Sequence, residues 1–392
     1  MRSKLPDVGT TIFTVMSRRA SELGAVNLGQ GFPDYPIDPR IAELVNVAMQ
    51  AGHNQYAPMQ GVPALQQAIA AQLVQRHGPG YHDGADPGRT ITVTLGATEA
   101  IYSAVQCCVG AGEEAIVFDP AYDSYDPAIR LAGARCIHIP LEPPVFRIDW
   151  DRVRGSISDR TRLVIINSPG NPSCAVLSAA DLDELARLAE RHDLVVISDE
   201  VYEHVVASHA RHASVLGHAA LARRSFAIYS FGKSLHATGI RIGYAVAPPA
   251  LTTELRKVHQ FNTFTIATAF QHAIAGYLVE KPDVFAGLAP FFVSRRGKLL
   301  DAIEGTGLVP LPAEGTYFQL VDYGASPRLA GLSDVDASMK LLEEGGVASI
   351  PLSPFYREPP PKASLIRLCF AKQEATIAEA GRRLRAFAGI AP

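Results

Sequence analysis

The chain has no long apolar run and little excess charge of either sign. None of the uninterrupted hydrophobic stretches in its 392 residues is long enough to cross a bilayer, so no membrane-spanning segment is expected. The formal net charge of −3 gives no electrostatic reason to expect nucleic acid or an anionic membrane as a partner. The N-terminus from Met1 to Pro6 lacks the apolar stretch of a secretory signal. A cytoplasmic location is therefore expected.

Cysteine is scarce, and the spacing of the five residues suits neither a metal cluster nor a disulfide framework. Cys107 and Cys108 are adjacent, and the other three are isolated in mostly apolar surroundings: Cys136, Cys174 and Cys369. We therefore expect buried free thiols in a reducing compartment. The twelve histidines show no metal-ligand spacing, so no metal is predicted. Four of them lie on a polar stretch and are predicted to be solvated: His204, His209, His212 and His218.

What the chain does contain is enough apolar sequence, 47% of its residues, for a large core in two or three structural units. Between about residues 90 and 250, short apolar runs alternate with helical patterns. The expected strands are Ile91–Leu95, Ala115–Phe118, Arg135–Ile139, Leu163–Asn167, Leu194–Ser198, Phe226–Ser230 and Ile242–Ala247. Ser178 has the position of a helix N-cap. Strands separated by helices predict an α/β fold with a mostly parallel central sheet covered by helices on both faces.

From about residue 282 onward the pattern changes to that of a smaller α+β domain. Helices are expected at Arg295–Glu304, Val335–Glu344 and Glu374–Phe387. Strands are expected at Tyr317–Val321 and Ser364–Phe370, and the proline-rich run 358–362 is predicted to be a surface loop.

Lys233 is the most informative residue of the chain. It directly follows Phe231-Gly232, between a β-rich run and a glycine-broken loop, which is a poor position for a solvated surface charge. A lysine that is desolvated or crowded by cations has a lowered pKa and becomes a neutral nucleophile able to form an imine. Ser230 and Arg241 flank it with groups that bind a phosphate ester. Together these residues predict pyridoxal 5'-phosphate (PLP) as cofactor. The alternative is a strand-end lysine with an unrelated arginine nearby.

Polar residues also follow other predicted strands, at the sheet edge where open α/β sheets bind ligands. The carboxylate of Asp199 could keep a pyridine nitrogen protonated, and Tyr202 could donate to the phenolic oxygen of the ring. A helix-terminal Asp199-Glu200 pair stabilised by the helix dipole is the alternative. Asn171, in the proline-stiffened loop 167–172, could reach both the ring oxygen and a substrate carboxylate, although such residues also build ordinary turns.

Three further features fit the same site, each with an ordinary structural alternative. Gly96-Ala97-Thr98 joins a strand to a helix and could present N–H groups to a phosphate, as many such turns could. Tyr122 could stack on a cofactor ring or be a core aromatic, and Tyr56 fits a phosphate site or a loop equally. Arg367 lies in an apolar strand, where an unpaired arginine is costly and where its planar fork suits a substrate carboxylate. An edge-strand arginine pointing to water is the alternative.

With these motifs assembled, the sequence resembles the class I and II aminotransferases of PLP fold type I. The matching segments are Asn27–Asp34, Gln55–Pro58, Gly96–Ala100, Asn167–Pro172, Ser198–Tyr202 and Ser230–Lys233. They occur in order, and the likeness runs from about residue 5 to the C-terminus, which makes it highly specific. Within that family, the sequence most resembles the branch that contains bacterial methionine aminotransferase and the kynurenine/glutamine transaminases. Three segments carry this finer resemblance: Thr10–Ser17, Asp119–Tyr125 and Ile366–Lys372.

The resemblance implies a role for each matching residue. Lys233 would hold the PLP aldehyde as a Schiff base and transfer the substrate proton, with Asp199 at the pyridinium. The ring would contact Tyr202, Asn171 and Tyr122. The phosphate would be bound beside Gly96 by the Ala97 and Thr98 amides, Ser230, Arg241, and Tyr56 of the partner subunit. The substrate carboxylate would be held by Arg367, Asn171 and the Gly31 backbone. An apolar side-chain pocket would be lined by Phe13, and by Phe264 of the partner subunit.

The enzyme implied by this resemblance moves the amino group of an L-amino acid to a 2-oxo acid in a ping-pong cycle. Methionine, aromatic or similar apolar donors are expected, because Phe13 and Phe264 offer no cation to an acidic side chain. A homodimer with shared active sites is implied, with a large PLP-binding domain at 36–280 and a small domain formed by 1–35 and 281–392. Two alternatives stay open: a PLP-dependent cysteine-conjugate C–S β-lyase, and a non-catalytic regulator on the same fold.

Overall fold

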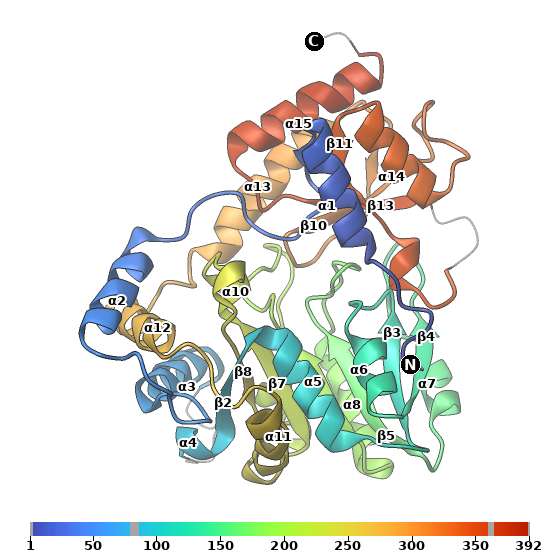
Figure 1. Cartoon of the computed structure of the whole chain (residues 1–392). Coiled ribbons are helices and arrows are strands. Elements are labelled where there is room, and N and C mark those ends of the chain that lie inside the picture. The colour runs from blue at the N-terminus through green and yellow to red at the C-terminus, as the bar shows by residue number, and fades with distance from the viewer. Residues whose placement is uncertain (1–2, 79–85, 360–363, 391–392) are drawn as a thin grey trace.

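A seven-stranded sheet forms the centre of the computed structural model, which describes residues 3–78, 86–359 and 364–390 (Figure 1). The strands are β2 Ile91–Thr94, β3 Glu114–Asp119, β4 Arg135–Pro140, β5 Thr161–Asn167, β6 Val195–Asp199, β7 Ser225–Ser230 and β8 Gly243–Val246. Their order is β2-β8-β7-β6-β5-β3-β4, and every pairing from β7 to β4 is parallel, whereas β8 pairs antiparallel with β7 and β2. The predicted α/β fold with a mostly parallel sheet is confirmed. All seven predicted strands form, with bounds within two residues of those expected.

Helices cover both faces of this sheet because its strands are apolar on both sides. In β5, Leu163 and Ile165 pack into the core on one face, and Val164 and Ile166 pack into the core on the other. The helices of the sheet region are α2 Pro39–Gln50, α3 Pro63–His77, α4 Pro87–Thr90, α5 Gly96–Cys108, α6 Tyr125–Leu131, α7 Trp150–Ser156, α8 Ala179–Arg191, α9 Ala219–Ala222, α10 Phe231–Ser234, α11 Pro249–Asn262 and α12 Thr268–Glu280. No helix of the described residues has both the length and the apolarity needed to cross a membrane.

The start of α8 shows how local sequence sets an element boundary. The Ser178 hydroxyl accepts a hydrogen bond from the Asp181 backbone N–H, and the Asp181 carboxylate accepts one from the Ser178 N–H. This reciprocal capping satisfies two backbone donors that the first helical turn leaves free. The predicted N-cap at Ser178 is confirmed.

The rest of the chain forms a second layer above the sheet, in which the N-terminal helix packs with C-terminal elements (Figure 1). Its helices are α1 Ile12–Leu23, α13 Leu288–Ile303, α14 Asp334–Glu343 and α15 Glu374–Phe387. Its strands are β1 Val26–Asn27, β9 Val309–Pro310, β10 Phe318–Asp322, β11 Val347–Ala348, β12 Ile350–Pro351 and β13 Leu365–Cys369. The sheet order is β12-β13-β10-β9, and β1 pairs separately with β11. The proposed domain limits at residues 35 and 280 stay predictions, and part of the predicted 358–362 loop lies outside the described residues.

Three expectations about these regions need correction. Helix α13 begins seven residues before the predicted Arg295, because Leu288 and Phe292 are buried and Pro290 falls in the first turn, where its missing N–H breaks no helical bond. His212 and His204 are not solvated: His212 Nε2 lies 3.1 Å from a carboxylate oxygen of the buried Glu200, and the His204 ring stacks on a phenylalanine. The five cysteines are free as expected, but only two are fully buried: Cys174 and Cys369.

Candidate active site

Lys233 lies on the short helix α10, between the central sheet and the layer that contains α1 and α13 (Figure 1). Its Nζ atom is 3.4 Å from the Gly31 carbonyl oxygen, and 5.8 and 5.9 Å from the ring centres of Tyr202 and Tyr317. Burial lowers the pKa of Lys233 to about 8, and the positive charge of Arg367 acts in the same direction. The neutral amine, which a nucleophile or base requires, is therefore far more populated near neutral pH than in an ordinary lysine.

Asp199 ends β6 at the carboxyl edge of the sheet and is buried. Its Oδ2 atom accepts a hydrogen bond of 2.6 Å from the Tyr125 hydroxyl, and Oδ1 accepts one of 3.3 Å from the Val201 N–H. Burial raises the pKa of Asp199 to about 6, and the Tyr125 hydrogen bond opposes that rise. Tyr125 was not among the predicted site residues, although it lies three positions after Tyr122 in one of the matching segments.

The loop after β5 is tied to β6 by Asn167, a second residue that the sequence did not single out. Its side-chain amide donates to the Asp199 carbonyl oxygen at 2.8 Å, and its Oδ1 atom accepts from the Asn171 N–H at 2.7 Å. These bonds fix the direction in which the Asn171 side chain leaves the loop. The Asn171 Oδ1 atom in turn accepts a hydrogen bond of 2.6 Å from Arg367.

Arg367 is 1% exposed in β13, yet it forms no ion pair with a carboxylate in the described part of the chain. Besides Asn171, its guanidinium donates to the Gly29 carbonyl oxygen at 3.1 Å, and its buried Nε atom has no hydrogen-bond partner. The guanidinium carbon lies 3.9 Å from the ring centre of Phe318 and 5.3 Å from that of Phe13. A buried, unpaired cation is costly, so this site fits an incoming anion. The edge-strand alternative, with Arg367 pointing to water, is wrong.

Two glycines allow the N-terminus of α5 to approach Arg241. Gly96 has a φ of +73°, and a Cβ atom there would lie 2.7 Å from Nη2 of Arg241. A Cβ at Gly243 in β8 would lie 2.7 Å from the Ala97 nitrogen. Helix N–H groups beside a guanidinium form an anion site. Ser230 ends β7, the strand next to β8, so it lies at the same sheet edge.

Aromatic side chains line the space around Lys233. Tyr202 is buried, which raises the pKa of its hydroxyl well above the usual value and keeps it protonated. Its ring meets that of Tyr317 edge to face at 5.0 Å. Tyr317, a third residue that sequence reasoning missed, donates from its hydroxyl to the Gly31 oxygen at 2.7 Å, the same oxygen that Lys233 approaches. Burial also raises the pKa of Tyr122, which is half-buried.

A cavity of about 370 Å³ opens beside these residues and is lined by Phe13, Tyr122 and Phe355 among others. The Phe13 and Phe355 rings meet edge to face at 5.5 Å, close to Arg367. The cavity therefore has aromatic walls next to the unpaired guanidinium, whereas much of its remaining lining is charged: Asp7, Asp123, Asp126, Arg130, His138 and Arg357.

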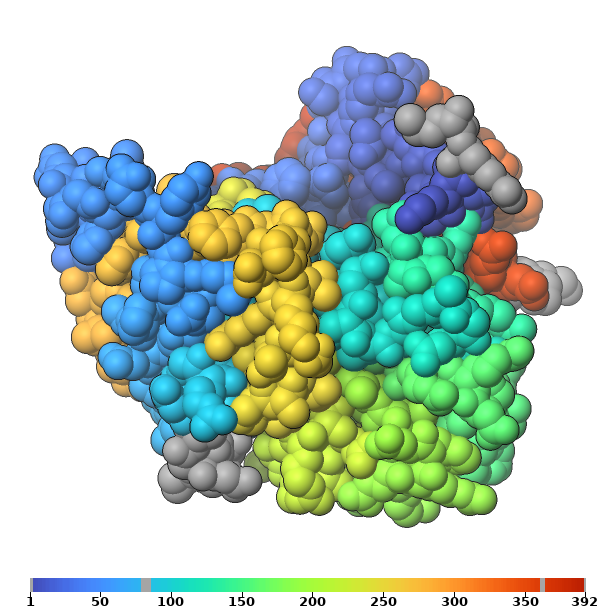
Figure 2. All heavy atoms as spheres, turned by 60° about the horizontal axis from the view of Figure 1, so that its bottom comes forward, coloured from blue at the N-terminus to red at the C-terminus, as the bar shows by residue number. Residues whose placement is uncertain are grey.

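Tyr56 and Phe264 lie elsewhere, on the molecular surface. They are 83% and 44% exposed, and their rings contact each other edge to face at 5.5 Å. Figure 2 shows the segments around residues 40–75 (blue) and 250–275 (yellow) side by side on this face. Neither residue has a hydrogen bond or ring contact to the groups around Lys233 in the described residues, so a single chain does not assemble the complete predicted set.

Comparison with known proteins identifies the family. The family model described as "Aminotransferase class I and II" matches residues 24–384. The chain belongs to the class I and II aminotransferases. Members of this family depend on PLP. This aminotransferase is 48% identical to the methionine aminotransferase of Escherichia coli over 98% of this chain and 97% of the relative. It is 31% identical to human kynurenine–oxoglutarate transaminase 1 over 93% of each chain.

Solved structures agree with this assignment. A crystal structure of an Escherichia coli protein with methionine aminotransferase function matches with a TM-score of 0.94, 47% identity, and coverage of 98% of this aminotransferase and 99% of that chain. An N-succinyldiaminopimelate aminotransferase from Mycobacterium tuberculosis matches with a TM-score of 0.92 at 39% identity, over 98% of this chain and 99% of the other. The fold type and the aminotransferase activity predicted from the sequence are confirmed.

Proposed function

We propose that this aminotransferase uses PLP to move the amino group of methionine, or of a similar apolar or aromatic L-amino acid, to a 2-oxo acid. The observation that carries the proposal is the placement of Arg367 next to Lys233. The two cations contact carbonyl oxygens of Gly29 and Gly31, only two residues apart on one backbone segment. An amino acid whose carboxylate pairs with Arg367 would therefore bring its α carbon toward the Lys233 amine.

The residues at the sheet edge fit the groups of PLP. Arg241 and the α5 N-terminus, at Ala97 and Thr98, provide an anion site for the phosphate, with the Ser230 hydroxyl beside it. Asp199 provides a buried carboxylate for the pyridinium nitrogen, and a positive partner there would offset the desolvation that now raises its pKa. When bound, PLP supplies an electron sink for the charge left at the substrate α carbon.

The chain's own groups then have separate tasks. Lys233, neutral above a pKa of about 8, would take the proton from the substrate α carbon and pass it to the cofactor carbon, and would move a proton in the opposite direction in the second half of the cycle. Tyr202 stays protonated and would donate a hydrogen bond to the ring oxygen, together with the Asn171 amide. Arg367 and Asn171 would orient the substrate carboxylate, and Tyr122 would pack against the ring. The Phe13 and Phe355 rings would pack against an apolar donor side chain.

The preference for an apolar donor rests on the cavity and on the relatives. Phe13 and Phe355 form its walls near Arg367, and neither offers a charge to an acidic side chain. The arginines elsewhere in the lining, Arg130 and Arg357, are both paired with Asp7. The Escherichia coli relative at 48% identity is a methionine aminotransferase, which makes methionine the first donor to test.

The exposed aromatic surface supports a homodimer. Tyr56, Phe264 and the 86%-exposed Phe261 place large apolar side chains in water on one face, and a second copy of the chain would bury them. In that arrangement Tyr56 of the partner subunit would reach the phosphate, and Phe264 of the partner subunit would close the donor pocket. Replacing Phe261 with aspartate would then shift the chain to a monomer in sedimentation and reduce activity.

The cytoplasmic location stays a prediction that cell fractionation can test.

The experiment that tests the proposed reaction is a panel of amino acids against several 2-oxo acids, with the cofactor spectrum as readout. Methionine should bleach the absorbance of the resting enzyme, and a 2-oxo acid should restore it. Pyruvate released from cysteine conjugates without added 2-oxo acid would instead support the β-lyase alternative. Persistence of amino transfer in Lys233→Ala would overturn the mechanism.

A further inference from the structure

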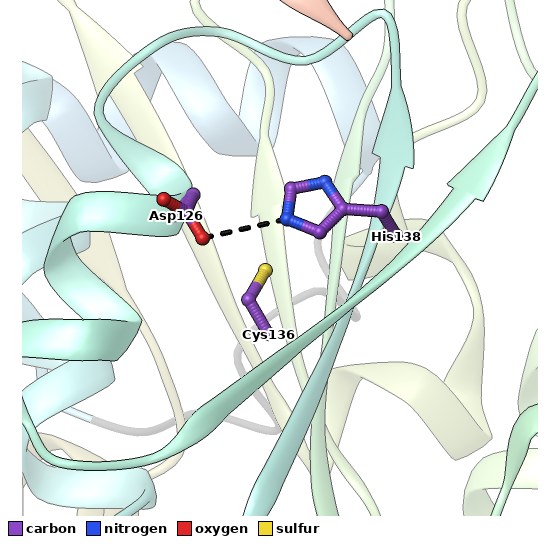
Figure 3. Close-up of side chains that lie close together, drawn as sticks. All are labelled: Asp126, Cys136 and His138. Carbon is purple, nitrogen blue, oxygen red and sulfur yellow. Dashed lines mark hydrogen bonds and ion pairs between the residues drawn. The ribbon is translucent and has the colours of Figure 1, made fainter. Parts of the chain in front are cut away.

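A histidine, a cysteine and an aspartate, none of them assigned a role in amino transfer, converge at the edge of the central sheet (Figure 3). Cys136 and His138 lie two positions apart on the edge strand β4, so their side chains leave the same face of the strand. Asp126 comes from α6, which packs over that face (Figure 3). The carboxylate, thiol and imidazole ligand atoms all lie within 4.8 Å of one another.

The Asp119 carboxylate fixes the orientation of the His138 ring through Nδ1, the nitrogen that faces away from Asp126. Its Nδ1 atom lies 3.0 and 3.1 Å from the two oxygens of Asp119, which is 2% exposed. Nε2 is the nitrogen that faces Asp126 and Cys136. Burial lowers the pKa of His138, but the hydrogen bonds to Asp119 and Asp126 outweigh it and raise the pKa to about 11, so an ion bound at Nε2 would displace a proton. This carboxylate–histidine pairing is the one that orients metal-binding histidines and raises their basicity.

The contact on the other side of the ring is a long hydrogen bond or ion pair whose distance also fits two ligands of one metal ion (Figure 3). Nε2 of His138 lies 3.4 Å from Oδ1 of Asp126, longer than the roughly 2.7–3.2 Å of ordinary hydrogen bonds. A nitrogen and an oxygen that share one tetrahedral zinc ion, at about 2.0–2.1 Å each, are separated by roughly 3.4 Å. The second oxygen of Asp126 is held at 3.0 Å by Arg130, which keeps Oδ1 directed at the ring.

An ion could reach this cluster from solvent. Asp126 and His138 both line the 370 Å³ cavity, which has room for a water molecule as the fourth ligand. The two carboxylates, Asp119 and Asp126, supply negative charge on opposite sides of the imidazole. We propose that Asp126, Cys136 and His138 bind a divalent cation of the zinc type, with Asp119 orienting His138.

A second grouping of potential ligands, Glu200, Glu203 and His212, lacks these properties. Glu200 already accepts from the Ser198 hydroxyl at 2.9 Å, the Tyr229 hydroxyl at 3.0 Å and His212 at 3.1 Å, all ordinary hydrogen-bond lengths. It is 0% exposed, and its carboxylate has no ligand position left for an ion.

The test is a cobalt(II) titration of the holoenzyme after treatment with a chelator. Cobalt(II) in a tetrahedral site with a thiolate ligand gives visible bands and a thiolate charge-transfer band. We expect saturation at one equivalent per chain and displacement by zinc(II). Cys136→Ser, a nearly isosteric change, should remove the charge-transfer band, and Asp119→Asn should weaken the affinity about 10- to 100-fold.

The matched control is Cys108→Ser, a half-buried cysteine on the end of α5, which should leave the titration unchanged. Retention of the cofactor spectrum by each variant shows that it is folded. Absence of saturable cobalt binding would overturn the proposal. Cobalt binding that is the same in Cys136→Ser as in the unaltered protein would mean an adventitious ion only, and would also overturn it.

Discussion

Replacing Tyr125 with phenylalanine removes a single hydroxyl from the candidate cofactor site and leaves the aromatic ring in place. Tyr125 is 3% exposed, and its hydroxyl lies 2.6 Å from Oδ2 of Asp199, the short distance typical of a donor to an ionised acceptor. A hydrogen bond to a charged group contributes about 1.5–3 kcal/mol. Its loss corresponds to roughly a 10- to 150-fold change in an equilibrium that needs the Asp199 carboxylate.

The equilibrium to measure is PLP binding to the apoenzyme, because Asp199 is proposed to pair with the pyridinium. Burial already raises the pKa of Asp199 to about 6, and removal of the Tyr125 hydroxyl should raise it further. A carboxyl with a raised pKa loses its charge as the pH falls through that pKa. PLP affinity of Tyr125→Phe should therefore be weaker at neutral pH, and the deficit should shrink as the pH rises well above the new pKa.

The assay is a PLP titration followed by cofactor absorbance at several pH values. Tyr102→Phe, which removes a hydroxyl from a half-buried tyrosine of α5, serves as the control and should bind PLP normally. If Tyr125→Phe bound PLP as tightly as the unaltered protein below and above neutrality, Asp199 would not be the charged partner of the ring.

Three further outcomes are expected. In the apoenzyme, Lys233 should react with an amine reagent with a midpoint near pH 8, because its lowered pKa leaves it protonated only below that value; a midpoint near the ordinary lysine pKa of 10.5 would contradict this. Arg367→Gln should lower kcat/KM for methionine, with a loss of about 2–5 kcal/mol in transition-state binding, while PLP still binds; an unchanged KM and kcat would refute the proposed pairing of Arg367 with the substrate carboxylate. Gly96→Ala should weaken PLP binding in a cofactor titration, since its Cβ would displace Arg241, whereas Gly110→Ala, with open space around it, should not.

The fold was largely predictable because its elements have clear patterns of apolar residues. Helix α15 has the predicted bounds, Glu374 and Phe387, since its buried residues recur three or four positions apart: Ile377, Ala380, Gly381, Leu384 and Phe387. The strands alternate with helices and end in polar residues, which indicates their parallel arrangement. The beginning of α13 was not predictable in this way, because a proline such as Pro290 usually indicates a break in a helix, although it is tolerated in the first turn.

The candidate site was predictable only where a residue type is unusual in its local sequence. Lys233 after a strand and Arg367 inside one are such cases. Tyr317 and Asn167 are ordinary in sequence, and their importance depends on partners brought close by folding, such as the Gly31 carbonyl oxygen 286 positions away. His212 was wrongly predicted to be solvated for the same reason, since the sequence does not show that its carboxylate partner is buried.

The most direct test of the central claim is to reduce the resting enzyme with borohydride, digest it and identify the modified peptide by mass spectrometry. We expect a phosphopyridoxyl group on Lys233 and loss of its attachment in Lys233→Ala. Modification of a different lysine, or none in enzyme saturated with PLP, would contradict this expectation.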